Sequence, residues 1–305
     1  MISAEETGDS AEFRGRIMKT RIISAAVMIA IVFAVLFTGY RYHTVIITIF
    51  IALLVAASTY EIMHNIVKTG TVFRKTVACV YSAAAFLAIS DIFHGAYDIL
   101  QKETAINEQG VSNSVLILLA SSIIYTLLFT VSIINEKREF DIKEIFALLG
   151  APIVYSAAFA SLDCIITRPG GIYYLLLVLN FSSVCDTGAY FTGMLLGKHK
   201  LCEHVSPKKT VEGAIGGVVL SIIVTVVFVL VRKTETNIFI MLGVTVVMCI
   251  VGMLGDLFAS VIKRSVGVKD YSNLIPGHGG ILDRFDSMLF ISPALLSLML
   301  LGVVK

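Results

Sequence analysis

Three carboxylates and a set of cations lie close together near the end of the sequence, between Gly255 and Ser287. Asp256 ends one apolar stretch, whereas Asp283 and Asp286 open the next and, three residues apart, share one face of a helix. Carboxylates at the ends of neighbouring helices can converge on a hard cation such as Mg²⁺, which prefers oxygen ligands and keeps waters that phosphate can replace. The positively charged or imidazole groups between them are Lys263, Arg264, Lys269, His278 and Arg284. This charge suits a triphosphate or a pyrophosphate leaving group.

A second polar region runs from Asp186 to Gly217. Asp186 lies inside an apolar stretch, where an ionised carboxylate usually faces a polar cavity or a partner. The segment Ser206-Pro207-Lys208-Lys209-Thr210 precedes a predicted helix, so its ammonium and hydroxyl groups suit a phosphate at the positive end of that helix. A positively charged anchor loop beside a membrane span is the alternative. Three glycines follow whose spacing fits close helix packing better than a phosphate cradle: Gly213, Gly216 and Gly217.

Taken one at a time, these residues also fit ordinary roles. Asp256 fits a helix cap, Asp283 with Arg284 an interfacial charge cluster, and His278 a loop residue without a role in proton transfer. Three carboxylates, five cationic or imidazole groups and the glycine-rich turn 276–280 within one short segment exceed what membrane anchoring requires. Phosphoryl or nucleotidyl transfer is the reaction class that this combination favours.

The elements that must position these residues are membrane helices. The chain has 305 residues, 57% of them hydrophobic and only 15% charged, with a mean hydropathy of +0.88. Soluble domains average about 25% charged residues, so this chain lacks the polar surface of a water-soluble globule. The net charge of +2 gives no support for nucleic-acid binding.

The sequence predicts an all-α, polytopic integral membrane protein with nine transmembrane helices and a cytoplasmic N-terminus. Apolar windows near the required length of about 20 residues recur along the chain. The predicted spans are 20–38, 43–60, 77–91, 113–134, 144–161, 172–196, 211–231, 237–255 and 281–303. With alternating sides, 18 of the 24 Lys and Arg residues fall in cytoplasmic segments, as the positive-inside rule expects. Both polar regions then face the cytoplasm, where nucleotides are found.

The chain divides by role into two predicted regions. Residues 171–305 form a C-terminal catalytic region with its motif loops, and residues 1–170 form N-terminal membrane helices that face lipid and shape the substrate site. Glu61 and His64, at the cytoplasmic end of the second span, either reach the site or are interfacial residues. Residue types alone do not decide between these two roles.

The segment from Ser260 to Asp286 resembles the signature of phosphatidate cytidylyltransferases, also called CDP-diacylglycerol synthases. The matching parts are Ser260-Val261-Ile262-Lys263-Arg264, Lys269-Asp270 and Ile275-Pro276-Gly277-His278-Gly279-Gly280-Ile281-Leu282-Asp283-Arg284-Phe285-Asp286. The 186–213 region resembles the family's other characteristic segment, with two departures. Val211 stands where tryptophan is usual, and Met194 where a basic residue is common.

The resemblance implies the reaction of CTP with phosphatidate to give CDP-diacylglycerol and pyrophosphate in a cell membrane. It implies Mg²⁺ with a second, monovalent cation such as K⁺, and it makes Asp256 and Asp283 the metal carboxylates, supported by Asp186 and Asp286. The phosphate-binding cations would be Lys208, Lys209, Lys263, Arg264 and Arg284, with Lys269 also near the substrate; Ser206, Thr210 and His278 are weaker candidates for substrate contact. Enzymes of this type often pair, which is compatible with a homodimer.

Two other functions fit parts of the sequence. A related enzyme of the same architecture would act on an isoprenoid lipid phosphate, a choice that the 20–170 region would shape. A proton- or ion-coupled transporter would explain Asp186 and other acids inside spans. It would not explain why acidic and basic groups gather in two cytoplasmic loops.

Overall fold

The computed structural model describes residues 4–66, 72–101, 108–134, 142–203, 205–232 and 236–304. Its helices are α1 (Ala4–Arg41), α2 (Val45–Ile66), α3 (Val72–Gln101), α4 (Glu108–Ile134), α5 (Ile142–Thr167), α6 (Gly171–Leu179), the π-helix η1 (Asn180–Val184), α7 (Cys185–Leu196), α8 (Val211–Arg232), α9 (Ile238–Ser265), α10 (Leu282–Phe285) and α11 (Met288–Leu300). The strands are β1 (Lys200–Cys202) and β2 (Ser206–Thr210).

The prediction of an all-α polytopic membrane protein is confirmed. Within the described residues, eight helical segments are long and apolar enough to cross a bilayer. The predicted ninth span, 281–303, is instead the short helix α10, a turn at Asp286 and the 13-residue helix α11. At about 1.5 Å per residue, α11 is shorter than a hydrocarbon core of about 30 Å. The count of nine therefore stays a prediction.

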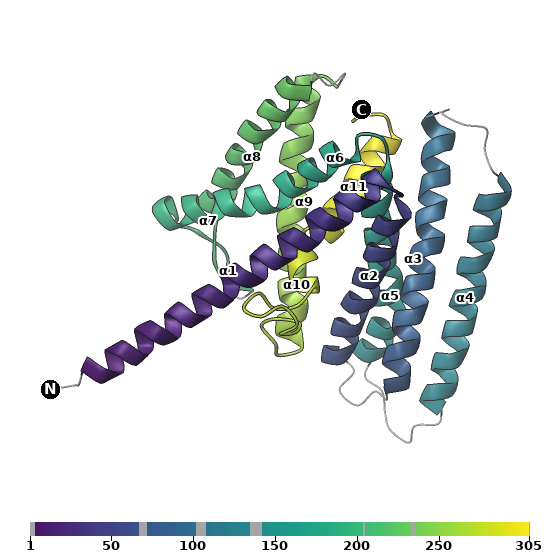
Figure 1. Cartoon of the computed structure of the whole chain (residues 1–305), viewed down its shortest axis with the longest axis horizontal. Helices are drawn as coiled ribbons and strands as arrows, with labels where there is room; N and C mark the ends of the chain where they lie inside the picture. Colours follow the sequence, from purple (N-terminus) through teal and green to yellow (C-terminus); the bar gives the residue numbers. More distant parts are fainter. Residues whose placement is uncertain are drawn as a thin grey trace.

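The helices form two packed groups (Figure 1). One group is the bundle of α2, α3, α4 and α5, and the other contains α7, α8 and α9, with α7 lying at a steep angle to α9. Helix α11 packs against both α5 and α9 and so joins the groups. Phe86, Phe159, Phe181 and Ile291 are among the fully buried side chains of the core. Burial of these apolar groups against one another fixes the platform that carries the polar loops.

The π-helix η1 places α7 across α8. Asn180 of η1 donates from Nδ2 to the Ser221 carbonyl at 3.1 Å and to Thr225 Oγ1 at 3.0 Å. An added Cβ at Gly217 would lie 2.5 Å from the Cys185 carbonyl oxygen, so only glycine permits this approach of the two helices. The interpretation of the glycine group as a packing surface is confirmed. A π-helix is frequently found at functional sites, and this one ends at Val184, two residues before Asp186.

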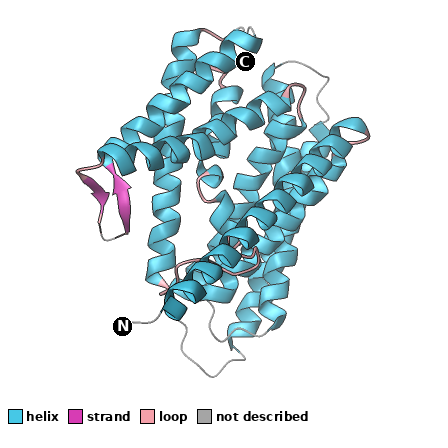
Figure 2. Cartoon of the chain, turned by 60° about the vertical axis from the view of Figure 1, so that its left-hand side comes forward, coloured by secondary structure: helices cyan, strands magenta, loops and turns pink. Residues whose placement is uncertain are grey.

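A β-hairpin joins α7 to α8, where the sequence predicted only a loop. β1 and β2 are antiparallel, with Lys200 opposite Thr210 and Cys202 opposite Ser206. Figure 2 shows the hairpin at the left edge of the molecule, projecting from the end of the helical region. Lys200 Nζ donates to the Pro207 carbonyl at 2.6 Å, and the Glu212 carboxylate accepts the N–H groups of Lys198 and His199. The hairpin thereby fixes the backbone that carries the Lys208–Lys209 pair.

Candidate active site

A cavity of about 350 Å³ lies between α7, β2, α8 and α9, and it is called the polar cavity because four charged side chains are in its lining. Asp186 enters it from α7, Asp256 from α9, and Lys208, Lys209 and Thr210 from β2. Lys209 Nζ forms an ion pair with Asp256 Oδ2, and both side chains keep about a quarter of their surface exposed, 25% and 22%. The cavity therefore brings two predicted acids and two predicted lysines together in one place.

The N-terminus of α8 closes one wall of this cavity. Thr210 Oγ1 accepts the Gly213 N–H at 3.1 Å and so caps the helix. Ser206 pairs in the hairpin and lies outside the residues that line the cavity. Met194, at the position where the resembled family commonly has a basic residue, lines the cavity and makes that wall apolar.

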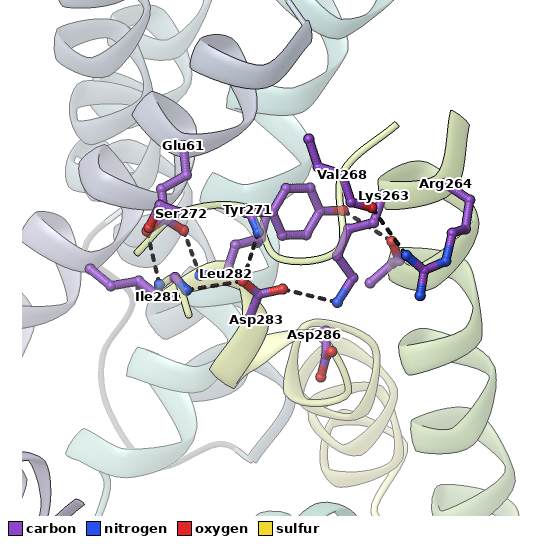
Figure 3. A network of polar contacts seen from close by, with 12 residues as sticks. Glu61, Lys263, Arg264, Val268, Tyr271, Ser272, Ile281, Leu282, Asp283 and Asp286 are labelled. Atoms are coloured by element: carbon purple, nitrogen blue, oxygen red, sulfur yellow. Dashed lines mark hydrogen bonds and ion pairs between the residues drawn. The ribbon is translucent and has the colours of Figure 1, made fainter. Parts of the chain in front are cut away.

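Asp283 is buried at the base of the loop that follows α9 (Figure 3). Its Oδ1 accepts Lys263 Nζ at 2.9 Å, and its Oδ2 accepts the backbone N–H groups of Tyr271 at 2.8 Å and Gly280 at 2.9 Å. The Asp283 side chain is only 2% exposed. The residue that the sequence proposed as a metal ligand thus holds the two ends of the loop together in this structure.

The glycine-rich turn is a tight turn and contacts α1. The His278 N–H donates to the Ile275 carbonyl at 2.9 Å, which closes a four-residue turn. Proline is the second residue of this turn and Gly277, with a φ of 77°, is the third, as in a type II turn. Ser24 Oγ of α1 lies 2.9 Å from His278 Nδ1 and donates to the Pro276 carbonyl at 2.9 Å. His278 therefore faces an N-terminal helix, which the sequence did not predict.

Glu61 of α2 also reaches this loop. Its carboxylate accepts Ser272 Oγ and the N–H groups of Ile281 and Leu282 (Figure 3). His64 has different neighbours, because its Nδ1 lies 3.3 Å from Lys75 Nζ and its ring stacks on Tyr60. Two roles were left open for Glu61 and His64, contact with the site or a place at the interface. Glu61 contacts the signature loop. An acid within an apolar helix was the signal that pointed to it.

Asp286 interacts electrostatically both with Lys263 and with the two acids of the polar cavity. Figure 3 shows its carboxylate directed away from the Lys263–Asp283 pair. Burial, with the negative charges of Asp256 and Asp186, raises the pKa of Asp286 to about 7, against the opposing effect of Lys263. Negative charge is therefore crowded where Asp186, Asp256 and Asp286 approach one another, and a cation would relieve it.

This crowding predicts the effect of Asp286→Asn on stability. A carboxyl group whose pKa rises from 3.8 to about 7 on folding destabilises the ionised native state, increasingly so as pH rises between these two values. In metal-free detergent the variant should therefore unfold at a higher temperature than the parent at pH 8, with a smaller difference at pH 5. Thermal unfolding at both pH values measures this. An equal or lower unfolding temperature at pH 8 would contradict it.

The remaining predicted cations lie on the surface. Arg264, Lys269 and Arg284 are exposed, and none of them lines the polar cavity. Arg264 Nη1 donates to the Val268 carbonyl at 3.3 Å, which closes the C-terminal end of α9. The structure thus gathers Asp186, Asp256, Lys208 and Lys209 around one cavity, whereas Arg264, Lys269 and Arg284 are not among the residues that line it.

The donor chemistry of the cavity fits Mg²⁺. Among the residues that the structure describes, no group of three or more His, Cys, Asp or Glu side chains is gathered closely enough to hold a metal alone. Mg²⁺ is usually bound by one or two carboxylates together with substrate phosphates, so such a cage is not required. Asp186 and Asp256 border the same cavity and are the two carboxylates that would hold the ion together with substrate phosphates. Asp286 adds its charge nearby, whereas Asp283 is engaged by three donors.

A second cavity of about 360 Å³ lies between α5, α9 and α11. Its lining is mostly apolar, with Asp286 and the hydroxyl-bearing Tyr155 and Tyr271 as its polar members. Phe258 and Val154 on its rim are 54% and 61% exposed, on helices long and apolar enough to cross a membrane. Asp286 therefore borders an apolar cavity while its charge interacts with the acids of the polar one.

Comparison with known proteins shows the family of the chain. A model of the cytidylyltransferase family matches residues 19–301, which is nearly the whole sequence. The chain belongs to this family. Proteins named phosphatidate cytidylyltransferase are similar to this family member over 129 residues, with 49% identity in Staphylococcus haemolyticus, 48% in Staphylococcus epidermidis and 47% in Staphylococcus aureus. Those 129 residues are 42% of this cytidylyltransferase-family chain, and the chain spans about half the length of the curated relatives it matches.

Proposed function

We propose that this protein transfers the cytidylyl group of CTP to phosphatidate, releasing pyrophosphate and forming CDP-diacylglycerol. The observation that carries the proposal is the polar cavity, in which Lys208 and Lys209 stand beside Asp186 and Asp256 on helices that cross a membrane. The choice of CTP and phosphatidate as substrates is supported by the name of the relatives, phosphatidate cytidylyltransferase. The polar loops would face the cytoplasm from a cell membrane, in agreement with the distribution of positive charge.

The reaction requires two phosphates of like charge to approach each other. A lipid-phosphate oxygen attacks the α-phosphorus of CTP, a new P–O bond forms, and the bond from that phosphorus to the bridging oxygen breaks with departure of pyrophosphate. Lys208 and Lys209 reduce the repulsion and hold phosphate oxygens in line. A phosphate monoester is already a competent nucleophile, so no side chain needs to form a covalent intermediate. Asp186 and Asp256, with the charge of Asp286 nearby, would hold Mg²⁺, and the ion would supply positive charge to the phosphate oxygens.

The two cavities separate the parts of the lipid by polarity. The polar cavity suits the nucleotide phosphates, because both lysines and aspartates line it. Its volume of about 350 Å³ fits a small ligand. The apolar cavity of α5, α9 and α11 suits an acyl chain, since its rim lies on membrane-crossing helices. Asp286 borders the apolar cavity and interacts electrostatically with the acids of the other. The lipid phosphate would lie near this residue.

The decisive experiment follows the label from CTP into lipid. Purified protein in detergent receives CTP labelled in the α-phosphate together with phosphatidate, an isoprenoid phosphate or no lipid, with and without EDTA. The proposal expects label in the lipid phase with phosphatidate and Mg²⁺, and its loss with EDTA. Label only with the isoprenoid phosphate would replace the lipid substrate. No label with either lipid would contradict nucleotidyl transfer and favour a transporter.

A further inference from the structure

Glu61 connects an N-terminal helix to the signature loop more than two hundred residues farther along the chain. Its Oε1 accepts Ser272 Oγ at 2.6 Å and the Ile281 N–H at 2.9 Å, and its Oε2 accepts the Leu282 N–H at 2.9 Å. The residue is only 4% exposed. A buried carboxylate is costly unless it is hydrogen-bonded, and here every donor comes from the loop and the helix start that follows it.

The contacts of Glu61 alternate with those of Asp283 along the backbone. The Gly280 N–H donates to Asp283 Oδ2, whereas the next two N–H groups, of Ile281 and Leu282, donate to Glu61. A displacement of Glu61 would therefore move the peptide that holds Asp283. The approach is close enough to require glycine at position 280, because an added Cβ there would lie 2.5 Å from Glu61 Oε2.

The other backbone donor to Asp283 is also held by α2. Tyr271 donates its N–H to Asp283 Oδ2, and its carbonyl accepts Asn65 Nδ2 at 2.5 Å. Asn65 stands one helical turn beyond Glu61, so the two side chains lie on the same face of α2. Both ends of the loop are thus fixed to one surface of this helix.

We propose that Glu61 is a positioning residue for nucleotidyl transfer, acting through the loop that sets Asp283 and Lys263. Glu61 borders neither cavity, so it acts on the site through its hydrogen bonds to this loop. The proposal rests on the proposed function for its effect on rate, but its effect on the loop can be measured without it. It also gives the N-terminal helices a direct part in the geometry of the C-terminal site.

Glu61→Gln tests the positioning. The glutamine keeps the shape but replaces one acceptor oxygen with an NH₂ group, which opposes a backbone N–H whichever way the amide is turned. Hydrogen exchange of the 271–282 backbone amides should accelerate about 10- to 100-fold, as expected for lost hydrogen bonds to a charged group. Turnover should fall about 100-fold with little change in the KM for CTP, because a misplacement of about 1 Å costs that much in rate.

Asp163→Asn is the matched control. Asp163 of α5 is 1% exposed and accepts Thr48 Oγ1 at 3.0 Å and Ser90 Oγ at 2.6 Å, so it is also a buried carboxylate bound by hydroxyls. Among the described residues it has no hydrogen bond to the loop. The control should change the unfolding temperature without accelerating exchange in 271–282. If it accelerated that exchange as much as Glu61→Gln does, the role of Glu61 would be general stability and the proposal would be overturned.

Two further variants keep the test decisive if Glu61→Gln does not fold. Ser272→Ala removes one donor from the loop side and leaves α2 unchanged, and Glu61→Asp keeps the charge on a shorter side chain. Both should accelerate exchange in 271–282 and slow turnover less than Glu61→Gln. Unchanged exchange in these variants overturns the positioning. A parent protein that makes no labelled lipid refutes the proposed function instead, and the exchange comparison still decides the role of Glu61.

Discussion

Asp256→Asn is expected to slow transfer of label from CTP to phosphatidate by about 100- to 1,000-fold, the loss typical of removing one preorganised electrostatic group. Asp256 borders the polar cavity, and its one ion pair among the described residues is with Lys209. The asparagine keeps the size of the side chain but removes the charge that would help to hold Mg²⁺. Its partly exposed position predicts that the protein stays folded. Initial rates over a range of Mg²⁺ concentrations, with thermal unfolding, measure both effects.

Asp91→Asn provides the control for this substitution. Asp91 is an exposed carboxylate on α3 that accepts a hydrogen bond from Ser114, its one side-chain partner within the part of the chain that the structure describes. It lies outside the residues that line either cavity. The control should retain the parent rate. Full activity of Asp256→Asn at low Mg²⁺ would remove Asp256 from the metal site.

The membrane helices could be predicted because hydropathy over about 20 residues is a local property of the sequence. The predicted span 172–196 corresponds to a helical segment from Gly171 to Leu196. Its π-helix was not predicted, because the extra turn residue is fixed by contacts of Asn180 with α8 rather than by composition. The hairpin of β1 and β2 is similarly set by tertiary contacts, including those of Glu212, in a segment of charged residues and one proline.

The candidate site was predictable in residue type but not in arrangement. Asp186, Asp256 and Lys209, which were predicted as functional residues, meet at one cavity, and their roles stay a prediction. Local sequence patterns cannot show which carboxylate accepts hydrogen bonds from the backbone. Asp283 does so, from the N–H groups of Tyr271 and Gly280. The contact between Glu61 and Ser272 joins positions 211 residues apart, a distance that no local pattern encodes.

Asp283→Asn is expected to reduce both stability and activity, unlike Asp256→Asn. The substitution leaves the Lys263 ammonium buried without its counter-charge, and breaking a buried ion pair from one side costs about 3–5 kcal/mol. The neutral amide oxygen would also accept the Tyr271 and Gly280 N–H groups more weakly than the carboxylate does. Thermal unfolding and the rate of label transfer should therefore fall together.

The double variant Lys263→Met with Asp283→Asn separates the two roles of this pair. It removes the unpaired ammonium, and the asparagine oxygen can still accept the N–H groups of Tyr271 and Gly280, so most of the lost stability should return. If activity returns as well, Asp283 serves only to shape the loop. If activity stays about 100-fold below that of the parent although stability is restored, the charges of the pair themselves act on the phosphates. We expect the second result, because the negative charge of Asp286 is already balanced in part by Lys263, so the pair lies within electrostatic reach of the acids at the cavity.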